Sequence, residues 1–239
     1  MSTLQGRTAV IIGGTSGMGF ATAQRLIADG AHVAIVGRDR AKAVQAGEAL
    51  GAAATVGVFD AADEAALRKF AEQLGSVDHV VSFAGLQPAV AIGKSTHDDF
   101  LSAFDARVWA ARNCCAVLAP LMPVDGSFTF CSGVSAVRPR AGRSPGAVAT
   151  AAVESFCRAM AVELAPIRVN AICPGAVETD VLRRALGTDP DAALARLAAS
   201  MPVGHVGQPA EIAHAVQFLM TNTFTTGITL RVDGGALLT

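Results

Sequence analysis

Short, mainly apolar runs alternate with longer stretches of helical periodicity along the chain, and this alternation most constrains the fold. The apolar runs, rich in β-branched residues, cover positions 8–12, 32–36, 54–59, 77–83, 127–131, 167–173 and 227–232. A strand that is apolar at every position is buried on both faces, because successive side chains point to opposite sides of a sheet. Such strands, alternating with helices, predict a parallel sheet covered by helices on both faces.

The stretches between the apolar runs are predicted to be helices. They cover residues 17–28, 63–74, 97–118 and 146–164, and a last helix opens at Pro209. Asp63 and Pro209 are residue types that suit a helix start. A chain of 239 residues fits one α/β domain. We therefore predict a single doubly wound α/β domain over residues 1–239, with a mainly parallel sheet of about seven strands. The polar segment 178–207 is predicted to be a mobile insertion on the substrate side.

Charge and apolar content exclude several classes of partner. The chain has 19 lysines and arginines against 20 aspartates and glutamates, a net charge of −1. No basic surface for nucleic acid or an acidic membrane is therefore expected. The longest apolar stretch, 114–124, is broken by Pro120 and Pro123 and is shorter than the ~20 residues of a spanning helix. Residues 1–12 show no apolar region before a cleavage site, so a cytoplasmic protein is expected.

The cysteines do not predict a metal or disulfide site. The five of them are Cys114, Cys115, Cys131, Cys157 and Cys173. They form no C-x-x-C pair and have no clustered histidine, so neither zinc nor a disulfide framework is indicated. We expect them to be small buried side chains in a reducing compartment.

A glycine-rich turn follows the first predicted strand. Glycines at such a turn let the chain reverse tightly and approach a pyrophosphate without a Cβ clash. The helix that starts there offers free N–H groups and its positive dipole end to the phosphates. A purely structural turn is the alternative, but the strand–turn–helix context favours dinucleotide binding. The predicted contacts are Gly13, Thr15, Ser16, Gly17, Met18 and Gly19.

The spacing of this turn, G-x-x-x-G-x-G, resembles the nucleotide signature of the short-chain dehydrogenase/reductase family. Further segments resemble that family in the same order along essentially the whole chain. They are Asp60, Ser82-Phe83-Ala84-Gly85 in place of N-N-A-G, Pro174-Gly175 with Thr179, and Val232-Asp233-Gly234-Gly235 near the end. The resemblance implies a Rossmann-type fold. It also implies cofactor contacts from Asp60, Ala61, Ala84, Gly85, Pro174, Gly175, Val177 and Thr179.

The end of the second predicted strand bears on which dinucleotide is bound. An acidic residue there would accept hydrogen bonds from the adenosine ribose and repel a 2′-phosphate. Gly37 occupies that position, and Arg38 follows it. A guanidinium can bind the 2′-phosphate in a bidentate manner and stack on adenine, so we predict NADP(H) rather than NAD(H). The alternative is that Arg38 only pairs with Asp39 or Asp60 on the surface.

The resemblance breaks down at the catalytic positions. Family members that reduce carbonyls use an Asn-Ser-Tyr-Lys set, in which a lysine lowers the pKa of the tyrosine that supplies the proton. This chain contains no tyrosine at all. Aligning on the helix after the fifth strand puts Gly146 at the tyrosine, Thr150 at the lysine and Gly133 at the serine. Arg107 stands at the asparagine position.

Arg107 and Ser132 are the remaining catalytic candidates. A guanidinium stays protonated, so Arg107 is a poor acid, but it can stabilise a developing oxyanion electrostatically. Ser132, beside Gly133, could orient a substrate oxygen. Arg138, Arg140 and Arg143 form a basic loop that would favour an anionic substrate, or is simply a solvated charged loop. His97 is the histidine expected near the cleft, where a capping or surface role is favoured.

Three functions fit these observations. The first is an NADP(H)-dependent oxidoreductase acting on a small carbonyl or alcohol without the tyrosine and lysine, because the cofactor itself carries the hydride chemistry. The second is a catalytically silent NADP(H)-binding sensor or scaffold. The third is a non-redox reaction on an anionic substrate, using Arg107 and the arginine loop. The survival of Pro174-Gly175 and Thr179 favours the first.

A homodimer or homotetramer is also expected. The predicted helices 97–118 and 146–164 resemble the pair through which family members associate. Small residues on the second helix, Ala147, Ala151 and Ala159, would permit close packing between subunits. Ordinary packing within one subunit is the alternative.

Overall fold

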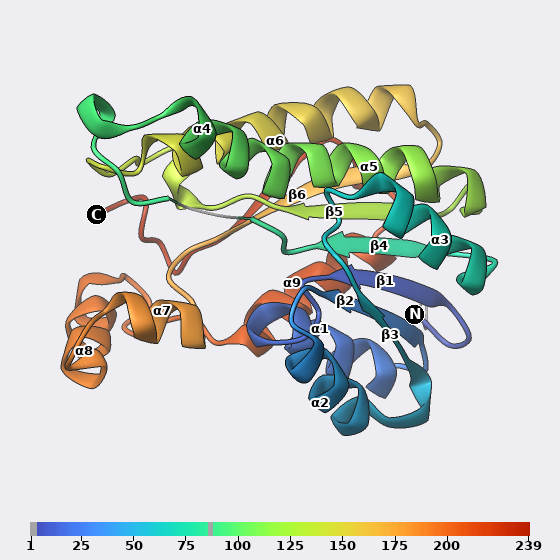
Figure 1. Cartoon of the computed structure of the whole chain (residues 1–239). Coiled ribbons are helices and arrows are strands. Elements are labelled where there is room, and N and C mark those ends of the chain that lie inside the picture. The colour runs from blue at the N-terminus through green and yellow to red at the C-terminus, as the bar shows by residue number, and fades with distance from the viewer. Residues whose placement is uncertain (1–3, 86–87) are drawn as a thin grey trace.

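Seven parallel strands form one sheet in the computed structural model, which describes residues 4–85 and 88–239. The strand order is β3-β2-β1-β4-β5-β6-β7, and Figure 1 shows the sheet between two layers of helices. The strands are β1 (Thr8–Ile12), β2 (His32–Gly37), β3 (Ala54–Val58), β4 (His79–Ser82), β5 (Ser127–Cys131), β6 (Arg168–Pro174) and β7 (Thr229–Val232). The predicted doubly wound fold is confirmed, with strand ends shifted by at most two residues.

The helices divide between the two faces of the sheet. One face carries α1 (Gly17–Ala28), α2 (Arg40–Leu50) and α9 (Pro209–Thr221). The other carries α3 (Glu64–Leu74), α4 (His97–Phe104), α5 (Ala110–Leu118) and α6 (Ser144–Glu163). Short 3-10 turns lie at Gly51–Ala53, Ile92–Lys94, Ala119–Leu121 and Val134–Ala136. The right-handed crossover of each strand–helix–strand unit accounts for this division.

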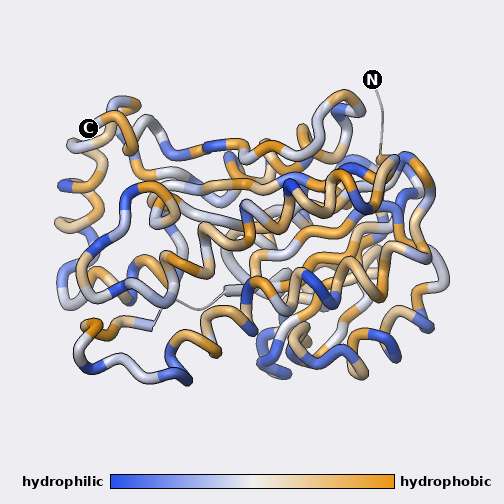
Figure 2. The backbone as a smooth tube through the Cα atoms, turned by 90° about the horizontal axis from the view of Figure 1, so that it is seen from above, coloured by the Kyte–Doolittle hydropathy of each residue, from blue (hydrophilic) through white to orange (hydrophobic). Residues whose placement is uncertain are grey.

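Each face of the sheet has its own apolar core. In β1, Val10 and Ile12 pack into the cluster under α3, α5 and α6, whereas Ala9 and Ile11 pack into the cluster under α1 and α9. Figure 2 shows the central strands as largely apolar, while the outer helices alternate apolar and polar stretches. The mainly apolar runs of the sequence are therefore explained by burial on both faces.

The predicted helix 97–118 is interrupted. Between α4 and α5 the chain forms a π-helical segment, Asp105–Trp109, which contains Arg107. Such a segment inserts extra backbone into a helical turn and is frequent at functional sites. It was not foreseen, because its stabilisation lies in contacts to other elements, described below.

The segment 178–207 contains two helices, where we had expected a flexible insertion. They are α7 (Asp180–Ala185) and α8 (Pro190–Ser200), and Figure 1 shows them beyond the end of the sheet, outside both helix layers. Thr179 caps α7 and Asp189 caps α8 by accepting a backbone N–H. Arg183 joins the two by ion pairs to Glu178 and Asp191. The expected mobility of this segment stays a prediction, but the segment is ordered into helices.

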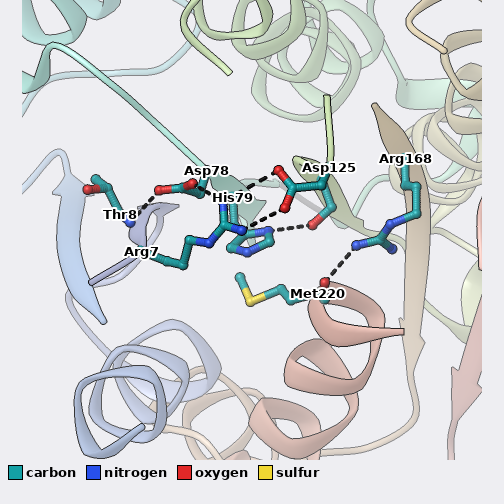
Figure 3. A network of polar contacts seen from close by, with 8 residues as sticks. Arg7, Thr8, Asp78, His79, Asp125, Arg168 and Met220 are labelled. Carbon is teal, nitrogen blue, oxygen red and sulfur yellow. Dashed lines mark hydrogen bonds and ion pairs between the residues drawn. The ribbon is translucent and has the colours of Figure 1, made fainter. Parts of the chain in front are cut away.

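A polar network ties the amino ends of the central strands together (Figure 3). Asp78 accepts hydrogen bonds from the Arg7 guanidinium at 2.5 Å and from the Thr8 N–H at 2.8 Å. Behind them, the buried His79 Nδ1 lies 2.8 Å from the Ser127 hydroxyl. Burial lowers the pKa of His79 to about 4. Because this network lies where the strands begin, it is structural and leaves the carboxyl edge free for a site.

Candidate dinucleotide site and substrate corner

The glycine turn is shaped for an anion. Gly13 and Gly17 have φ of +77° and +53°, a region that favours glycine. A Cβ on Gly19 would overlap the Gly13 carbonyl, so only glycine lets α1 approach the turn this closely. Ser16, the N-cap of α1, makes no side-chain capping bond. The first N–H groups of the helix therefore remain available to donate hydrogen bonds to a ligand. These features fit a dinucleotide phosphate.

Segments distant in sequence converge on this turn. A Cβ added to Gly13 would lie 3.7 Å from the Ala84 nitrogen, and a Cβ added to Gly17 would lie 3.1 Å from the Thr179 methyl carbon. Gly175 packs against Asp233 so closely that a Cβ would lie 2.7 Å from the Asp233 Cα. The structure therefore brings four of the motifs from the sequence to one edge of the sheet. The Thr179 hydroxyl also accepts the Leu182 N–H at 3.3 Å.

The remaining predicted contacts flank this edge. Ala61 and Val177 are buried, and Val177 pairs with Gly207 in an isolated bridge. The loop that carries Asp60 and Ala61 is held by Asn113, whose amide donates to the Ala61 and Ala62 carbonyls at 3.1 and 2.9 Å. Sequence reasoning missed Asn113. Its signal was a polar residue inside an apolar helical stretch.

The structure leaves no room for an acid at the end of β2. A Cβ on Gly37 would lie 2.5 Å from the Thr15 methyl carbon. Arg38 Nη1 lies 3.5 Å from Asp60 Oδ2, and these side chains are 62% and 46% exposed. Asp39 instead caps α2. The surface pair weighed as an alternative is thus present, but an exposed pair of this kind contributes only ~0–1 kcal/mol and exchanges readily for a ligand.

The positions aligned with the family serine, tyrosine and lysine form one corner without an acid or base. Thr150 is fully buried, and its hydroxyl donates to the Gly146 carbonyl at 2.5 Å. A Cβ on Gly133 would lie 3.7 Å from the Thr150 methyl carbon. Ser135 approaches the Thr150 hydroxyl at 3.4 Å. The three positions are adjacent, as the resemblance implies, and their side chains offer no group that titrates near neutral pH.

Arg107 lies beneath the ends of β4 and β5. It is 7% exposed, and its Nη1 donates to the Cys131 carbonyl and, at 3.3 Å, to the Ser132 carbonyl. Its guanidinium packs closely against Gly85, where a Cβ added to the glycine would lie only 2.7 Å from the Arg107 Cζ. Its Nε has no partner, and within residues 4–85 and 88–239 no carboxylate forms an ion pair with it. Arg107 is therefore a buried charge that is held by backbone oxygens.

The Ser132 hydroxyl is already engaged. It is 3% exposed and donates to Glu154 Oε1 at 2.5 Å, with the Thr150 carbonyl at 3.4 Å. Sequence reasoning missed Glu154, which lies one helical turn beyond Thr150. Its signal was a lone carboxylate between residues 144 and 162 of an alanine-rich helix. Ser132 and Glu154 form the one hydroxyl–carboxylate pair that borders this corner in the described chain.

The other charged candidates have different roles. Arg138 donates to the carbonyls of Ala236, at 2.9 Å, and of Thr239, so it fastens the C-terminal segment. The His97 side chain is 81% exposed at the start of α4. All five cysteines are buried thiols, and burial raises the pKa of Cys114 and Cys157 to about 12. No described helix is long and apolar enough to cross a membrane.

A glycine turn with the shape that suits a phosphate, at the carboxyl edge of a doubly wound parallel sheet, is typical of dinucleotide-binding proteins of the Rossmann type. Residues 13–236 match a family model described as enoyl-(acyl carrier protein) reductase. The short-chain dehydrogenase/reductase ucsE of an Acremonium species is 34% identical, over 98% of this chain and 97% of that protein. The chain belongs to the short-chain dehydrogenase/reductase family of oxidoreductases.

Solved structures agree with this assignment. The MalC reductase/Diels-Alderase of Malbranchea aurantiaca superposes with a TM-score of 0.93 at 29% identity, covering 99% of this chain and 98% of that one. A small-chain dehydrogenase in complex with NADPH superposes with a TM-score of 0.84 at 33% identity, covering 98% of this chain and all of that one. These relatives support a nicotinamide cofactor and a small-molecule substrate.

Proposed function

We propose that this chain is a single-domain, NADP(H)-dependent oxidoreductase that acts on a small carbonyl- or alcohol-type substrate without the tyrosine and lysine of its family. Two observations together carry the proposal. The cofactor cradle, which we define as the glycine turn 13–19 with the segments at 60–61, 84–85 and 174–179, is retained, whereas the tyrosine and lysine of the family's proton relay are missing. Gly13, Gly17 and Gly19 keep the conformation and the space that a phosphate needs, while Gly146 and Thr150 supply no acid.

The residues of the cradle have separate tasks. The uncapped N–H groups at Ser16–Gly19 would bind the pyrophosphate, and Asp60, with the backbone of Ala61, would contact the adenine. Ala84, Gly85, Pro174, Gly175, Val177 and Thr179 would line the nicotinamide half, following the resemblance. When bound, the cofactor supplies or accepts the hydride. Holding the two reactants in place is the main contribution of the protein to such a step.

One feature of the corner would replace part of the relay. The buried Arg107 charge stabilises negative charge that develops on a substrate oxygen nearby, in an environment where water screens little. The proton would come from water, because Gly146 and Thr150 supply no acid. Losing one general acid typically costs ~10²–10⁴-fold in rate, so a slow but real turnover is expected.

Arg38 favours NADP(H) over NAD(H) in this proposal. Removing a charge-assisted contact to a 2′-phosphate costs ~1.5–3 kcal/mol, or roughly 10- to 100-fold in affinity. Arg38→Leu should therefore raise the Kd for NADPH by that factor and raise the Kd for NADH much less, because NADH shares only the adenine. Lys69→Leu is the matched control, because it removes an exposed cation on α3, and it should leave the Kd for NADPH unchanged. Equal affinity of the unaltered protein for NADH and NADPH would contradict the preference.

A silent NADP(H)-binding sensor or scaffold is the second candidate function. It is favoured by Thr150, whose buried hydroxyl is committed to the Gly146 carbonyl and so cannot act on a ligand. Mixing the protein and NADPH with a panel of carbonyls and quinones, and following the cofactor absorbance, separates the two. Substrate-dependent oxidation of NADPH supports the enzyme. Tight NADPH binding with no turnover across the panel supports the sensor.

A homodimer or homotetramer and a cytoplasmic location remain proposals. Ala151 and Ala159 are exposed on α6, together with Val148 and Val162, and an apolar helix face of this kind suits association. Ala147 cannot contribute as we had expected, because it is only 8% exposed. Light scattering tests the oligomeric state, and a monomeric mass would contradict it.

A further inference from the structure

The buried charge of Arg107 is not accounted for by the fold. Its Nη1 hydrogen bonds and its packing against Gly85 hold the guanidinium in place, yet its Nε is left unpartnered and no described carboxylate pairs with it. An uncompensated buried cation is costly, and a neutral side chain could donate to the same carbonyls. The charge itself therefore calls for a functional explanation.

The position of this charge relates it to the cradle. The loop after β4 packs against the glycine turn through Phe83 and Ala84, and its Gly85 lies directly against the Arg107 guanidinium. The carbonyls that Arg107 binds lie at the end of β5, between β4 and the end of β6 at Pro174. A ligand that extends from the glycine turn towards Pro174 and Thr179 therefore passes the end of the strands under which Arg107 lies.

One carboxylate offsets this charge in part. Glu154 is linked to the same backbone through the Ser132 hydroxyl, and Arg107 donates to the Ser132 carbonyl. The other acidic residue close in sequence, Asp105, is exposed at the start of the π-helical segment, where water screens it. Arg107 and Glu154 thus bring opposed charges to the end of β5, while Arg231 and Asp233 add opposed charges near the end of β6.

We propose that Arg107 makes the site discriminate between the two redox states of its cofactor and hold the reduced form more tightly. The inference rests on the proposed function, since it requires a nicotinamide dinucleotide in the cradle. The oxidised nicotinamide ring carries a positive charge and the reduced ring is neutral, while all other parts of the two forms are the same. A fixed cation beneath the strand ends therefore disfavours the oxidised form alone.

This selectivity has a consequence for cofactor exchange. A site that binds the reduced form more tightly fills with NADPH and releases NADP⁺ quickly. Arg107 is then a specificity-determining residue, which acts through its charge and needs no contact with the substrate.

The test is the ratio of two affinities, Kd for NADP⁺ divided by Kd for NADPH. NADPH is titrated by its fluorescence and NADP⁺ by calorimetry, with no substrate present. Arg107→Gln keeps a donor for the Cys131 carbonyl and removes the charge, so the ratio should fall about tenfold, or about 1.4 kcal/mol. Glu154→Gln removes the opposed charge and should raise the ratio severalfold. Lys69→Gln, an exposed cation on α3, should leave it unchanged.

The two variants are chosen because their effects have opposite signs. A general loosening of the fold would weaken both cofactor forms together and would not move the ratio in both directions. An unchanged ratio in folded Arg107→Gln overturns the inference, and if that variant does not fold, an unchanged or lowered ratio in Glu154→Gln overturns it. If the unaltered protein binds neither form, the proposed function fails and the inference fails with it.

Discussion

His79 makes the stability of this protein depend on pH between about 4 and 6.5. Its side chain is 5% exposed at the start of β4, and its Nδ1 lies 2.8 Å from the Ser127 hydroxyl. Burial is the largest cause that lowers its pKa from 6.5 to about 4, and the positive charges of Arg168 and Arg7 lower it further, against Asp78. The unfolded chain therefore binds a proton at this histidine before the folded chain does.

The size of the effect follows from the two pKa values. Stability is complete above about pH 6.5, where His79 is neutral in both states, and is lost as the pH falls towards 4. A shift from 6.5 to about 4 corresponds to a loss of about 3.4 kcal/mol at most. Between pH 7.5 and pH 5 the loss attributable to this residue is about 2 kcal/mol.

Urea unfolding at pH 7.5 and at pH 5 measures this loss. His79→Asn can keep a hydrogen bond to Ser127 and does not titrate, so its stability should change about 2 kcal/mol less than that of the unaltered protein over this range. His97→Asn replaces an exposed histidine and should keep the original dependence. If His79→Asn and the unaltered protein lose the same stability on acidification, the reasoning from burial is refuted.

Three further predictions concern the cradle, the core and the thiols. Gly19→Ala should weaken NADPH binding at least about tenfold, because its Cβ overlaps the Gly13 carbonyl; Gly93→Ala meets nothing within 4 Å and should bind normally in the same titration. Arg168→Met should destabilise the fold by about 2–4 kcal/mol in urea unfolding, because Arg168 donates to the carbonyls of Leu219 and Met220 at the end of α9, both at 2.6 Å. A loss below about 1 kcal/mol would count against this role. The five cysteines should resist a thiol reagent at pH 8 until the chain is unfolded, because burial raises the pKa of Cys114, Cys157 and Cys173 to about 12; rapid modification of the native protein would contradict this.

The fold could be predicted from the sequence because its signals are local. Residues 9–12 are apolar at every position, which in a parallel sheet means burial on both faces, and the structure divides them between two cores. The glycine turn was predicted for the same kind of reason, since Gly13 and Gly17 adopt backbone conformations that depend on few neighbours. The helices within 178–207 were not predicted, and this also has a local cause. A polar composition is shared by loops and by small surface helices such as α7 and α8.

The site was only half predictable. The positions of Gly133, Gly146 and Thr150 followed from the resemblance, and they lie together in one corner. The partners of Arg107 and Ser132 did not follow, because the Cys131 carbonyl and the Glu154 carboxylate come from other elements. Nothing in the order of residues says which side chains will meet across a helix and a strand.

The sequence by itself determined the fold class, the phosphate turn and the loss of the tyrosine, because periodicity, glycine spacing and a missing residue type can be read without coordinates. Only the tertiary structure decided that Arg107 is a buried charge without an ion pair and that Ser132 faces Glu154. The physical reason is that burial and electrostatic compensation depend on distances between segments far apart in the chain. Those distances are set when the helices pack on the two faces of the sheet.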